Sequence, residues 1–186
     1  FMPRPRRFQA ELVAVRDLTH DIREFQFRGD EPARFLPGQY VLFSLPGVPG
    51  ARAYSMANIP DETGEWHFQV KRVPNGRCTG TLFDVLRVGE KVDFDGPYGQ
   101  AYLRTDSPRD IVCIAGGSGL SPVMSIARAV AGAPELAERK VHFFYGGRGP
   151  KDIVGEKMLR ELPGYGERIF YYPAISMPEL DGEGTW

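Results

Sequence analysis

The hydrophobic pattern of this chain changes near residue 105, and that change limits the folds open to it. Before it, short segments alternate apolar and polar residues, as in residues 24–28 (EFQFR). After it, residues 111–115 (IVCIA) are apolar throughout. A period of two is typical of a strand with one buried face, and a continuous apolar run is typical of a strand covered on both faces. We therefore expect two units, residues 1–105 and 106–186.

The first unit is predicted to be an antiparallel barrel. Six segments rich in Val, Phe and Tyr are separated by turns rich in Gly and Pro. The candidate strands are residues 8–15, 22–28, 39–45, 51–57, 66–73 and 91–95. Six short strands favour closure, because a closed sheet has no exposed edges. One helix, at about residues 79–87, is expected before the last strand.

The second unit alternates strands and helices. Strands are predicted at residues 110–115, 141–145 and 168–172, and helices at residues 121–131 and 151–162. Ser121 is expected as the N-cap of the first helix and Pro122 as its first helical residue. This alternation predicts a parallel sheet with right-handed crossovers. The tail at residues 177–186 shows no clear element.

Charge and hydrophobicity exclude several function classes. The 186 residues carry a formal net charge of -1, so nucleic acid is not an expected partner. No apolar stretch approaches the roughly 20 residues of a membrane-spanning helix. We therefore expect a cytoplasmic protein without a membrane partner.

The cysteines and histidines give no metal-binding pattern. Cys113 lies in an apolar strand and is expected to be a small buried side chain, while Cys78 lies in a glycine-containing segment. Two cysteines cannot hold an iron–sulfur cluster. His20, His67 and His142 are scattered without the spacing of metal ligands, so no metal site is expected.

A glycine-rich segment at residues 116–122 (GGSGLSP) follows a predicted buried strand and opens a predicted helix. Glycines let the backbone approach a pyrophosphate, and a helix N-terminus offers free N–H groups and partial positive charge. The spacing G-x-G-x-x-P departs from the common dinucleotide fingerprint. A tight turn without a ligand is the alternative interpretation.

Residues 52–55 (RAYS) place a cation, an aromatic ring and a hydroxyl on one predicted strand. Residues two apart point to the same face of a sheet, so Arg52 and Tyr54 are expected to share one side. They could then serve one extended ligand through phosphate binding and ring stacking. The alternative is an edge strand with an exposed Arg52 and a half-buried Tyr54.

Three further segments carry weaker signals. Residues 75–79 precede the small helix and offer either an anion site or a simple N-cap. Residues 96–99 (GPYG) end the last predicted barrel strand and can be a plain turn. Residues 145–148 end the second parallel strand, where dinucleotide folds often place the adenosine ribose. Arg148 there can accept the extra phosphate of NADPH or be a solvated surface residue. No nucleophile–base arrangement is apparent.

Taken in order, these segments resemble the motifs of the ferredoxin–NADP reductase superfamily, and most of all the reductase components of bacterial multicomponent oxygenases for phenol, toluene or methane. The resemblance implies an antiparallel six-stranded Greek-key FAD-binding barrel followed by a parallel-sheet nicotinamide-binding domain. Family members continue past the third parallel strand with a Cys-Gly-Pro segment and a further strand. The second domain is therefore expected to be C-terminally incomplete.

The resemblance also implies roles for individual residues. Arg52 would hold the FAD pyrophosphate, Tyr54 would pack on the isoalloxazine ring, and Ser55 would hydrogen-bond flavin N5, so that Tyr54 and Ser55 are the expected catalytic residues. Residues 76–79 would bind the FAD phosphates, residues 117–122 the nicotinamide dinucleotide, and Arg148 its adenosine end. The full expected cofactor-binding set is Arg52, Tyr54, Ser55, Val70, Lys71, Gly76, Arg77, Cys78, Thr79, Gly96, Pro97, Tyr98, Gly99, Gly117, Ser118, Gly119, Leu120, Pro122, Tyr145 and Arg148.

The activity implied is hydride transfer from NAD(P)H to flavin N5, followed by one-electron transfer to a [2Fe-2S] centre outside this chain. That centre would lie in a ferredoxin domain or a partner protein and would serve an oxygenase component. NADH is favoured over NADPH, although Arg148 taken alone favours NADPH. Two alternatives remain: a stand-alone reductase of free flavin, ferric chelate or a cytochrome, and a flavin-binding fragment without full turnover.

Overall fold

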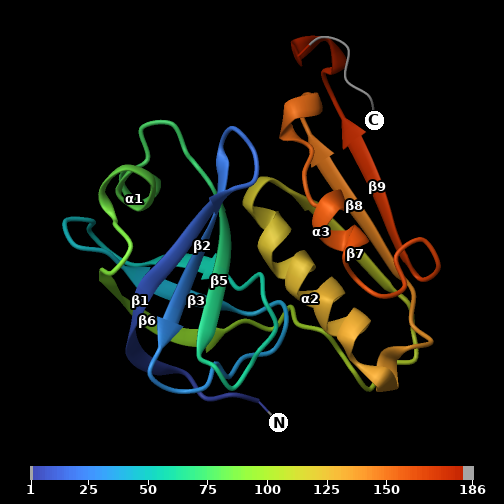
Figure 1. Ribbon diagram of the computed structural model, residues 1–186, viewed down its shortest axis with the longest axis horizontal. Coiled ribbons are helices and arrows are strands. Elements are labelled where there is room, and N and C mark those ends of the chain that lie inside the picture. Colours follow the sequence, from blue (N-terminus) through green and yellow to red (C-terminus); the bar gives the residue numbers. More distant parts are fainter. Residues whose placement is uncertain (1, 182–186) are drawn as a thin grey trace.

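The computed structural model describes residues 2–181. It contains a six-stranded antiparallel sheet and a three-stranded parallel sheet. Figure 1 shows helix α2 (Leu120–Gly132) lying between the two sheets, in contact with both. The two sheets lie on either side of the change in hydrophobic pattern near residue 105, and one helix contacts both of them.

The antiparallel sheet is a nearly closed barrel. Its strands are β1 (Arg6–Asp17), β2 (Ile22–Gly29), β3 (Tyr40–Ser44), β4 (Arg52–Ser55), β5 (Glu65–Lys71) and β6 (Lys91–Tyr98). The order β4-β3-β6-β1-β2-β5 puts β4 and β5 at the two ends of the sheet. Just past β4, the Ala57 backbone amide donates to the His67 carbonyl of β5 at 2.7 Å, which narrows the gap between these two end strands. The predicted six-stranded antiparallel barrel is confirmed.

Aromatic side chains fill the barrel. Phe25 and Phe27 of β2 are fully buried, as the alternation at residues 24–28 predicts. Phe43 stacks on Phe94 with ring centroids 4.5 Å apart, and Phe68 meets Phe43 edge to face at 4.7 Å. Burying each such ring contributes about 1.5–3 kcal/mol before entropy is counted. The core therefore holds the barrel strands, β4 included, in a fixed frame.

Several barrel boundaries differ from the prediction by one to three residues. Strand β6 runs on to Tyr98 instead of ending at residue 95, because Gly96 lets it pass close to β3. A Cβ at Gly96 would lie 2.8 Å from Val41 Cγ1. The small helix begins two residues earlier than predicted, as α1 (Arg77–Gly80), and continues as the π-helix η1 (Thr81–Val85).

The parallel sheet consists of β7 (Ile111–Gly116), β8 (Val141–Gly147) and β9 (Ile169–Ile175) in that order. The other elements are α3 (Glu156–Arg160) and the 3-10 helices η2 (Gly117–Gly119), η3 (Pro134–Leu136), η4 (Pro150–Asp152) and η5 (Pro178–Asp181). The predicted strand–helix alternation is confirmed. Cys113 is buried as expected, and burial raises the pKa of its thiol to about 12.

The helices of this half depart from the prediction in their boundaries. The second helix is a 3-10 turn followed by the short α3, because Gly155 between them has φ of +109°. Helix α2 begins at Leu120 with Gly119 as its N-cap, so Ser121 is not the cap and Pro122 is not the first helical residue. The tail contains η5, where no element was expected, and residues 182–186 lie outside the described residues.

One face of the parallel sheet is more exposed than predicted. Val112 and Ile114 of β7 are 62% and 78% exposed, so the expectation of a strand covered on both faces was wrong. Helix α2 covers the side of the sheet that carries Cys113 and Phe143. On the exposed side, Phe144 and Tyr172 stack at 4.6 Å.

Candidate functional site

Strand β4 presents its side chains at an end of the barrel sheet. Its register pairs Arg52 with Phe43 and Tyr54 with Val41. Phe43 and Val41 are both core residues, so Arg52 and Tyr54 share the core-side face of the sheet. Ser55 pairs with Tyr40 and lies on the other face. A short end strand therefore carries a cation and a ring on one side and a hydroxyl on the other.

Tyr54 is held at both ends of its side chain. Its ring lies 4.8 Å from the ring of Phe43, and its hydroxyl donates to Cys78 Sγ at 3.2 Å. Burial raises the pKa of the phenol, and the hydrogen bond to Cys78 raises it further. The half-buried ring is therefore neutral at physiological pH, with fixed position and orientation.

Arg52 is exposed and has only carbonyl partners. Its guanidinium donates to the carbonyl oxygens of Ala51 at 3.1 Å and Pro49 at 3.4 Å. It forms no ion pair with a carboxylate in the described part of the chain. A guanidinium held near its own backbone can still bind a phosphate with its remaining N–H groups.

A cleft of about 230 Å³ separates β4 from the glycine-rich loop. The residues around it come from both halves of the molecule: Ala53, Tyr54, Ser55, Gln69, Ser118, Gly119, Ser121 and Pro122. The structure therefore brings the two strongest sequence signals, residues 52–55 and 116–122, to opposite sides of one opening. Their separation along the chain gives no local hint of this contact.

A hydrogen bond from Tyr145 of β8 holds the glycine-rich loop in place. Gly117 has φ of +55°, a left-handed conformation that favours glycine. The Gly117 carbonyl oxygen accepts a hydrogen bond at 3.0 Å from the hydroxyl of Tyr145, a buried residue. Burial raises the pKa of Tyr145 to about 12, so this hydroxyl stays protonated and remains a donor.

The segment before α1 is a tight loop closed by Thr79. The Thr79 hydroxyl accepts from the Val73 backbone amide at 3.0 Å, and no side chain caps the start of α1. The N-cap is Gly76, where a Cβ would lie 2.8 Å from Thr79 Oγ1. Arg77 is exposed beside this loop. A side chain at Gly76 would therefore clash with Thr79, so the tight packing of this loop requires glycine at the helix start.

Positive charges gather at the far end of the interface between the two halves. A hollow of about 640 Å³ is lined by His20, Asp21, Lys71, Arg72, Pro74, Arg148, Lys151, Asp152 and Leu180. Lys71 lies 3.6 Å from Asp21, and its stem passes over the glycine-rich loop, where a Cβ at Gly117 would meet Lys71 Cδ at 3.2 Å. Arg148 is exposed at the mouth. This hollow suits an anionic ligand.

The same hollow groups three residues of metal-ligand type that the sequence did not bring together. His20 Nε2 lies 3.5 Å from a carboxylate oxygen of Asp21 and 3.5 Å from one of Asp152. All three ligand atoms lie within 4.8 Å of one another. Lys71 already pairs with Asp21, and the Gly149 amide donates to Asp152 at 2.9 Å, so other partners occupy these carboxylates.

Several residues of the expected cofactor-binding set have buried side chains. They are Val70, Cys78, Thr79, Leu120 and Tyr145. Such residues can meet a ligand mainly through their backbone or by supporting a neighbour. Tyr98 donates to Asp95 at 2.8 Å, and residues 96–98 belong to β6 and do not line the cleft between β4 and the glycine-rich loop.

Gln69 and Ser121 join the two halves; the sequence did not single out Gln69, and it assigned Ser121 a different role, that of an N-cap. The Ser121 hydroxyl accepts a hydrogen bond from the backbone N–H of Gln69 at 2.7 Å and donates one to the backbone carbonyl of Gln69 at 3.1 Å. The Gln69 side chain donates to Glu24 at 2.9 Å and to Met158 Sδ at 3.4 Å. The alternation of β5 would place Gln69 on the polar face with His67 and Lys71, so its burial breaks the pattern, and nothing local identified its partners.

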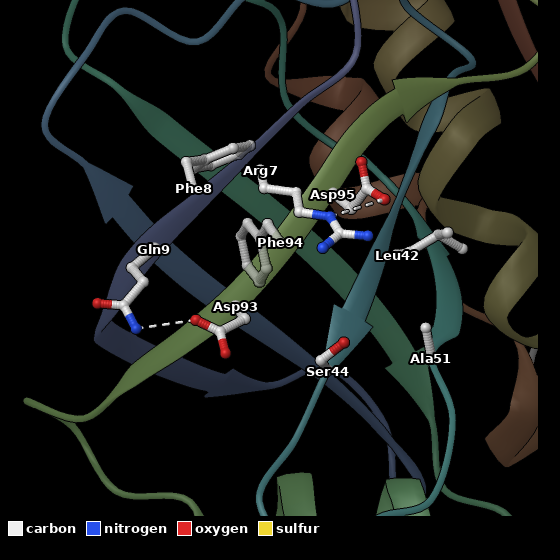
Figure 2. Close-up of a pocket in the computed structure, with 9 residues that line it drawn as sticks. All are labelled: Arg7, Phe8, Gln9, Leu42, Ser44, Ala51, Asp93, Phe94 and Asp95. Carbon is white, nitrogen blue, oxygen red and sulfur yellow. Dashed lines mark hydrogen bonds and ion pairs between the residues drawn. The ribbon is translucent and has the colours of Figure 1, made fainter.

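A separate groove of about 630 Å³ crosses the outer face of the barrel (Figure 2). Its polar side chains pair with one another: Gln9 donates to Asp93 at 2.8 Å, and Arg7 lies 3.9 Å from Asp95. Figure 2 shows these pairs across strands β1 and β6, with Leu42 and Ala51 along the other side. The groove therefore offers no unpaired charge comparable to Arg52.

No helix in residues 2–181 combines the length and apolarity needed to cross a membrane. Two family models match the chain: an oxidoreductase FAD-binding domain over residues 9–102 and an oxidoreductase NAD-binding domain over residues 113–184. The first contains β4 and the loop before α1, and the second contains the glycine-rich loop and Arg148. The two sides of the cleft therefore fall in two different cofactor-binding families.

Curated relatives and solved structures agree with this match. The chain is 44% identical to the ferredoxin–NAD(P)(+) reductase CarAd of Metapseudomonas resinovorans over 149 residues, covering 80% of this chain and 44% of the relative. It is 33% identical to the phenol 2-monooxygenase reductase component DmpP of Pseudomonas sp. (strain CF600) over 176 residues, covering 95% and 49%. The ferredoxin reductase in carbazole 1,9a-dioxygenase superposes with a TM-score of 0.85 at 37% identity, covering 97% and 53%.

The chain spans about half the length of the curated relatives it matches. Over that half, the order of the matched domains follows the order of the two sheets, with the FAD-binding match on the barrel and the NAD-binding match on the parallel sheet. The chain therefore belongs to the ferredoxin–NADP reductase family of FAD- and NAD-binding oxidoreductases.

Proposed function

We propose that this chain is the flavin- and nicotinamide-binding part of an electron-transfer reductase that serves an oxygenase through an iron–sulfur partner. The observation that carries the proposal is the single cleft between Tyr54-Ser55 of β4 and the glycine-rich loop. A flavin on one side and a nicotinamide on the other would meet there, as hydride transfer requires. We take residues up to 105 as the flavin domain and residues from 106 as the nicotinamide domain.

The residues around β4 suit FAD. Arg52 offers a guanidinium without a carboxylate partner for the pyrophosphate, and Tyr54 offers a fixed, neutral ring for stacking. The half-buried Ser55 offers a hydroxyl that can donate to N5. The backbone of residues 76–79 and the exposed Arg77 are the proposed partners of the phosphates. Bound FAD supplies the redox chemistry, taking hydride at N5 and releasing electrons singly, while these residues bind and orient it.

The residues beyond the cleft suit a nicotinamide dinucleotide. The glycine-rich loop at 117–119 and the start of α2 offer backbone N–H groups for a pyrophosphate. Lys71 lies over that loop, and Arg148 lies beyond it at the end of β8. We favour NADH, because the chain resembles oxygenase reductases, while Arg148 leaves NADPH as the competing cofactor.

The electron acceptor is proposed from the relatives. Proteins similar to this chain are named as reductase components of phenol, naphthalene and alkene oxygenase systems, several of them as ferredoxin reductases. We propose a [2Fe-2S] centre in a ferredoxin domain or separate protein as the acceptor, and an oxygenase component beyond it. Both cysteines are free thiols, in keeping with a reducing cytoplasm, where we place the protein.

An anaerobic titration tests the proposal. The chain is loaded with FAD, and the visible flavin absorbance is followed while NADH and NADPH are added in parallel samples. We expect bleaching by both, at lower concentrations of NADH. Failure to take up FAD would refute the proposal. A yellow protein that neither nucleotide bleaches would instead be a flavin-binding piece without turnover.

Arg148→Ala sharpens the same titration. If Arg148 receives the extra phosphate of NADPH, the variant loses its response to NADPH and keeps its response to NADH. An equal loss with both nucleotides would place Arg148 on a shared part of the dinucleotide instead. Arg160→Ala is a suitable control, because Arg160 is an exposed cation that pairs with Glu156 on α3.

A further inference from the structure

We propose that the Cys78 thiol is a positioning residue that fixes the Tyr54 ring for the flavin and couples it to the phosphate-binding loop. The inference rests on the proposed function, since it concerns the ring on which the isoalloxazine would pack. It assigns a task to the sulfur atom, whereas the motif at residues 76–79 concerns the backbone and the Thr79 hydroxyl. The supporting observation is the 3.2 Å hydrogen bond from the Tyr54 hydroxyl to Cys78 Sγ.

The contact is one of two that define the orientation of Tyr54. The Tyr54 ring packs against the Phe43 ring, with ring centroids 4.8 Å apart and an interplanar angle of 54°. The hydroxyl end reaches Cys78, which is 7% exposed and belongs to the same core cluster. A tyrosine side chain has two main torsions, so contacts at both ends leave its plane little freedom. Without the sulfur, the hydroxyl would lose its protein partner at a half-buried position.

Cys78 is itself fixed by its neighbours. It lies between Arg77 and Thr79 in α1, and the Thr79 hydroxyl ties the helix back to the Val73 amide at 3.0 Å. The Gly80 amide also donates to the Gly76 carbonyl at 2.8 Å. The sulfur is therefore part of the loop that is proposed to hold the FAD phosphates. Movement of that loop would be transmitted to Tyr54 through one side-chain contact.

The structure gives the thiol no other evident task. Cys113, the other cysteine, belongs to the core of the parallel-sheet half, and both thiols are free. Sulfur is a weak hydrogen-bond acceptor, so the contact serves orientation more than overall stability. The step is purely non-covalent: the hydroxyl donates and the sulfur accepts.

The experiment compares four variants of the FAD-loaded chain: Cys78→Ala, Cys78→Ser, Tyr54→Phe and the double variant Cys78→Ala/Tyr54→Phe. The readouts are the visible absorption and circular dichroism of bound FAD and the dissociation constant of FAD. Cys78→Ala and Tyr54→Phe should change the flavin spectrum in the same way and weaken FAD binding about threefold to tenfold, as loss of one hydrogen bond implies. The double variant should match either single variant, because both remove the same contact.

Cys78→Ser should restore the wild-type flavin spectrum, because its hydroxyl can accept the same hydrogen bond. Cys113→Ala is the matched control, since it removes a buried thiol from the other core. Far-UV circular dichroism identifies any variant that fails to fold. If Cys78→Ala fails to fold, the flavin spectrum of Cys78→Ser tests the inference in its place. A wild-type flavin spectrum in Cys78→Ala, or additive effects in the double variant, would overturn the inference. Failure of the unaltered chain to bind FAD would instead overturn the proposed function.

Discussion

At the scale of single residues, Arg52 is the charge on which cofactor retention should depend most. It is exposed, and among the described residues only carbonyl oxygens accept its hydrogen bonds. We predict that Arg52→Ala purifies largely without flavin, because the proposed contact between the guanidinium and the pyrophosphate would be lost. Arg52→Lys should retain part of the flavin, since lysine supplies the charge but not the planar fork. The ratio of flavin to protein absorbance measures both.

The control for Arg52 is Arg34→Ala, which removes an exposed arginine that pairs with Glu62 on the barrel at 2.6 Å. This variant should stay fully yellow. A fully yellow Arg52→Ala preparation would show that the guanidinium does not hold the cofactor.

Ser55 belongs to the same strand but is expected to affect rate more than binding. Its half-buried hydroxyl lines the cleft opposite the glycine-rich loop. We predict that Ser55→Ala keeps FAD and slows flavin reduction by NADH by about a hundredfold, because one oriented donor near the reacting atom is lost. Stopped-flow absorbance measures the rate. An unchanged rate rejects the role, and Ser44→Ala on the exposed end of β3 is the matched control.

At the scale of elements, the docking of α2 on β5 decides whether the two halves of the cleft face each other. The buried Ser121 hydroxyl bonds both the amide and the carbonyl of Gln69. We predict that Ser121→Ala lowers the free energy of unfolding by about 1–3 kcal/mol, because the buried backbone N–H of Gln69 loses its hydrogen-bond acceptor. Urea unfolding measures this. Ser176→Ala, at an exposed position, should leave stability unchanged, and equal stability of both variants would contradict the prediction.

The start of α2 also explains one sequence-based error. A serine–proline pair at the front of an apolar helix is typical of an N-cap and a first helical residue. Here η2 at residues 117–119 starts the helical turn earlier, and the Ser121 hydroxyl is engaged by a strand 52 residues away. A tertiary contact therefore replaced a local cap.

At the scale of the whole molecule, a buried carboxylate lies near the contact between the two halves, since its partners Gln69 and Arg16 both reach Met158 Sδ of the second half. Glu24 of β2 is 2% exposed, accepts hydrogen bonds from Gln69 and Gln26, and lies 3.5 Å from Arg16. Burial alone would raise the pKa of its carboxyl, but the hydrogen bonds and the positive charge of Arg16 outweigh burial and lower it. The ionised form is therefore the one that the folded protein stabilises.

This lowered pKa sets a pH dependence. A group whose pKa is lower in the folded state stabilises the fold above its unfolded pKa, here near 4.5, and loses that contribution as the pH falls through its folded pKa. We predict that Glu24→Gln is less stable than the unaltered chain at pH 7, and that its stability falls less steeply below pH 4.5. Chemical denaturation between pH 7 and pH values below 4.5 measures how the free energy of unfolding of each protein changes with pH. Glu138→Gln, at an exposed position, is the control, and parallel acid slopes for all three proteins would contradict the prediction.

The sequence by itself determined the class of fold and the two motifs that face the cleft. Alternation at residues 24–28, the apolar strand at residues 111–115 and the glycines at 116–119 act locally, through strand pleating and backbone freedom, so they can be recognised without a partner. Only the tertiary structure decided that Ser121 docks on Gln69, that Cys78 meets Tyr54, and that one face of β7 stays exposed. These features depend on contacts between segments far apart in the chain, and the residue types alone do not specify which segments meet.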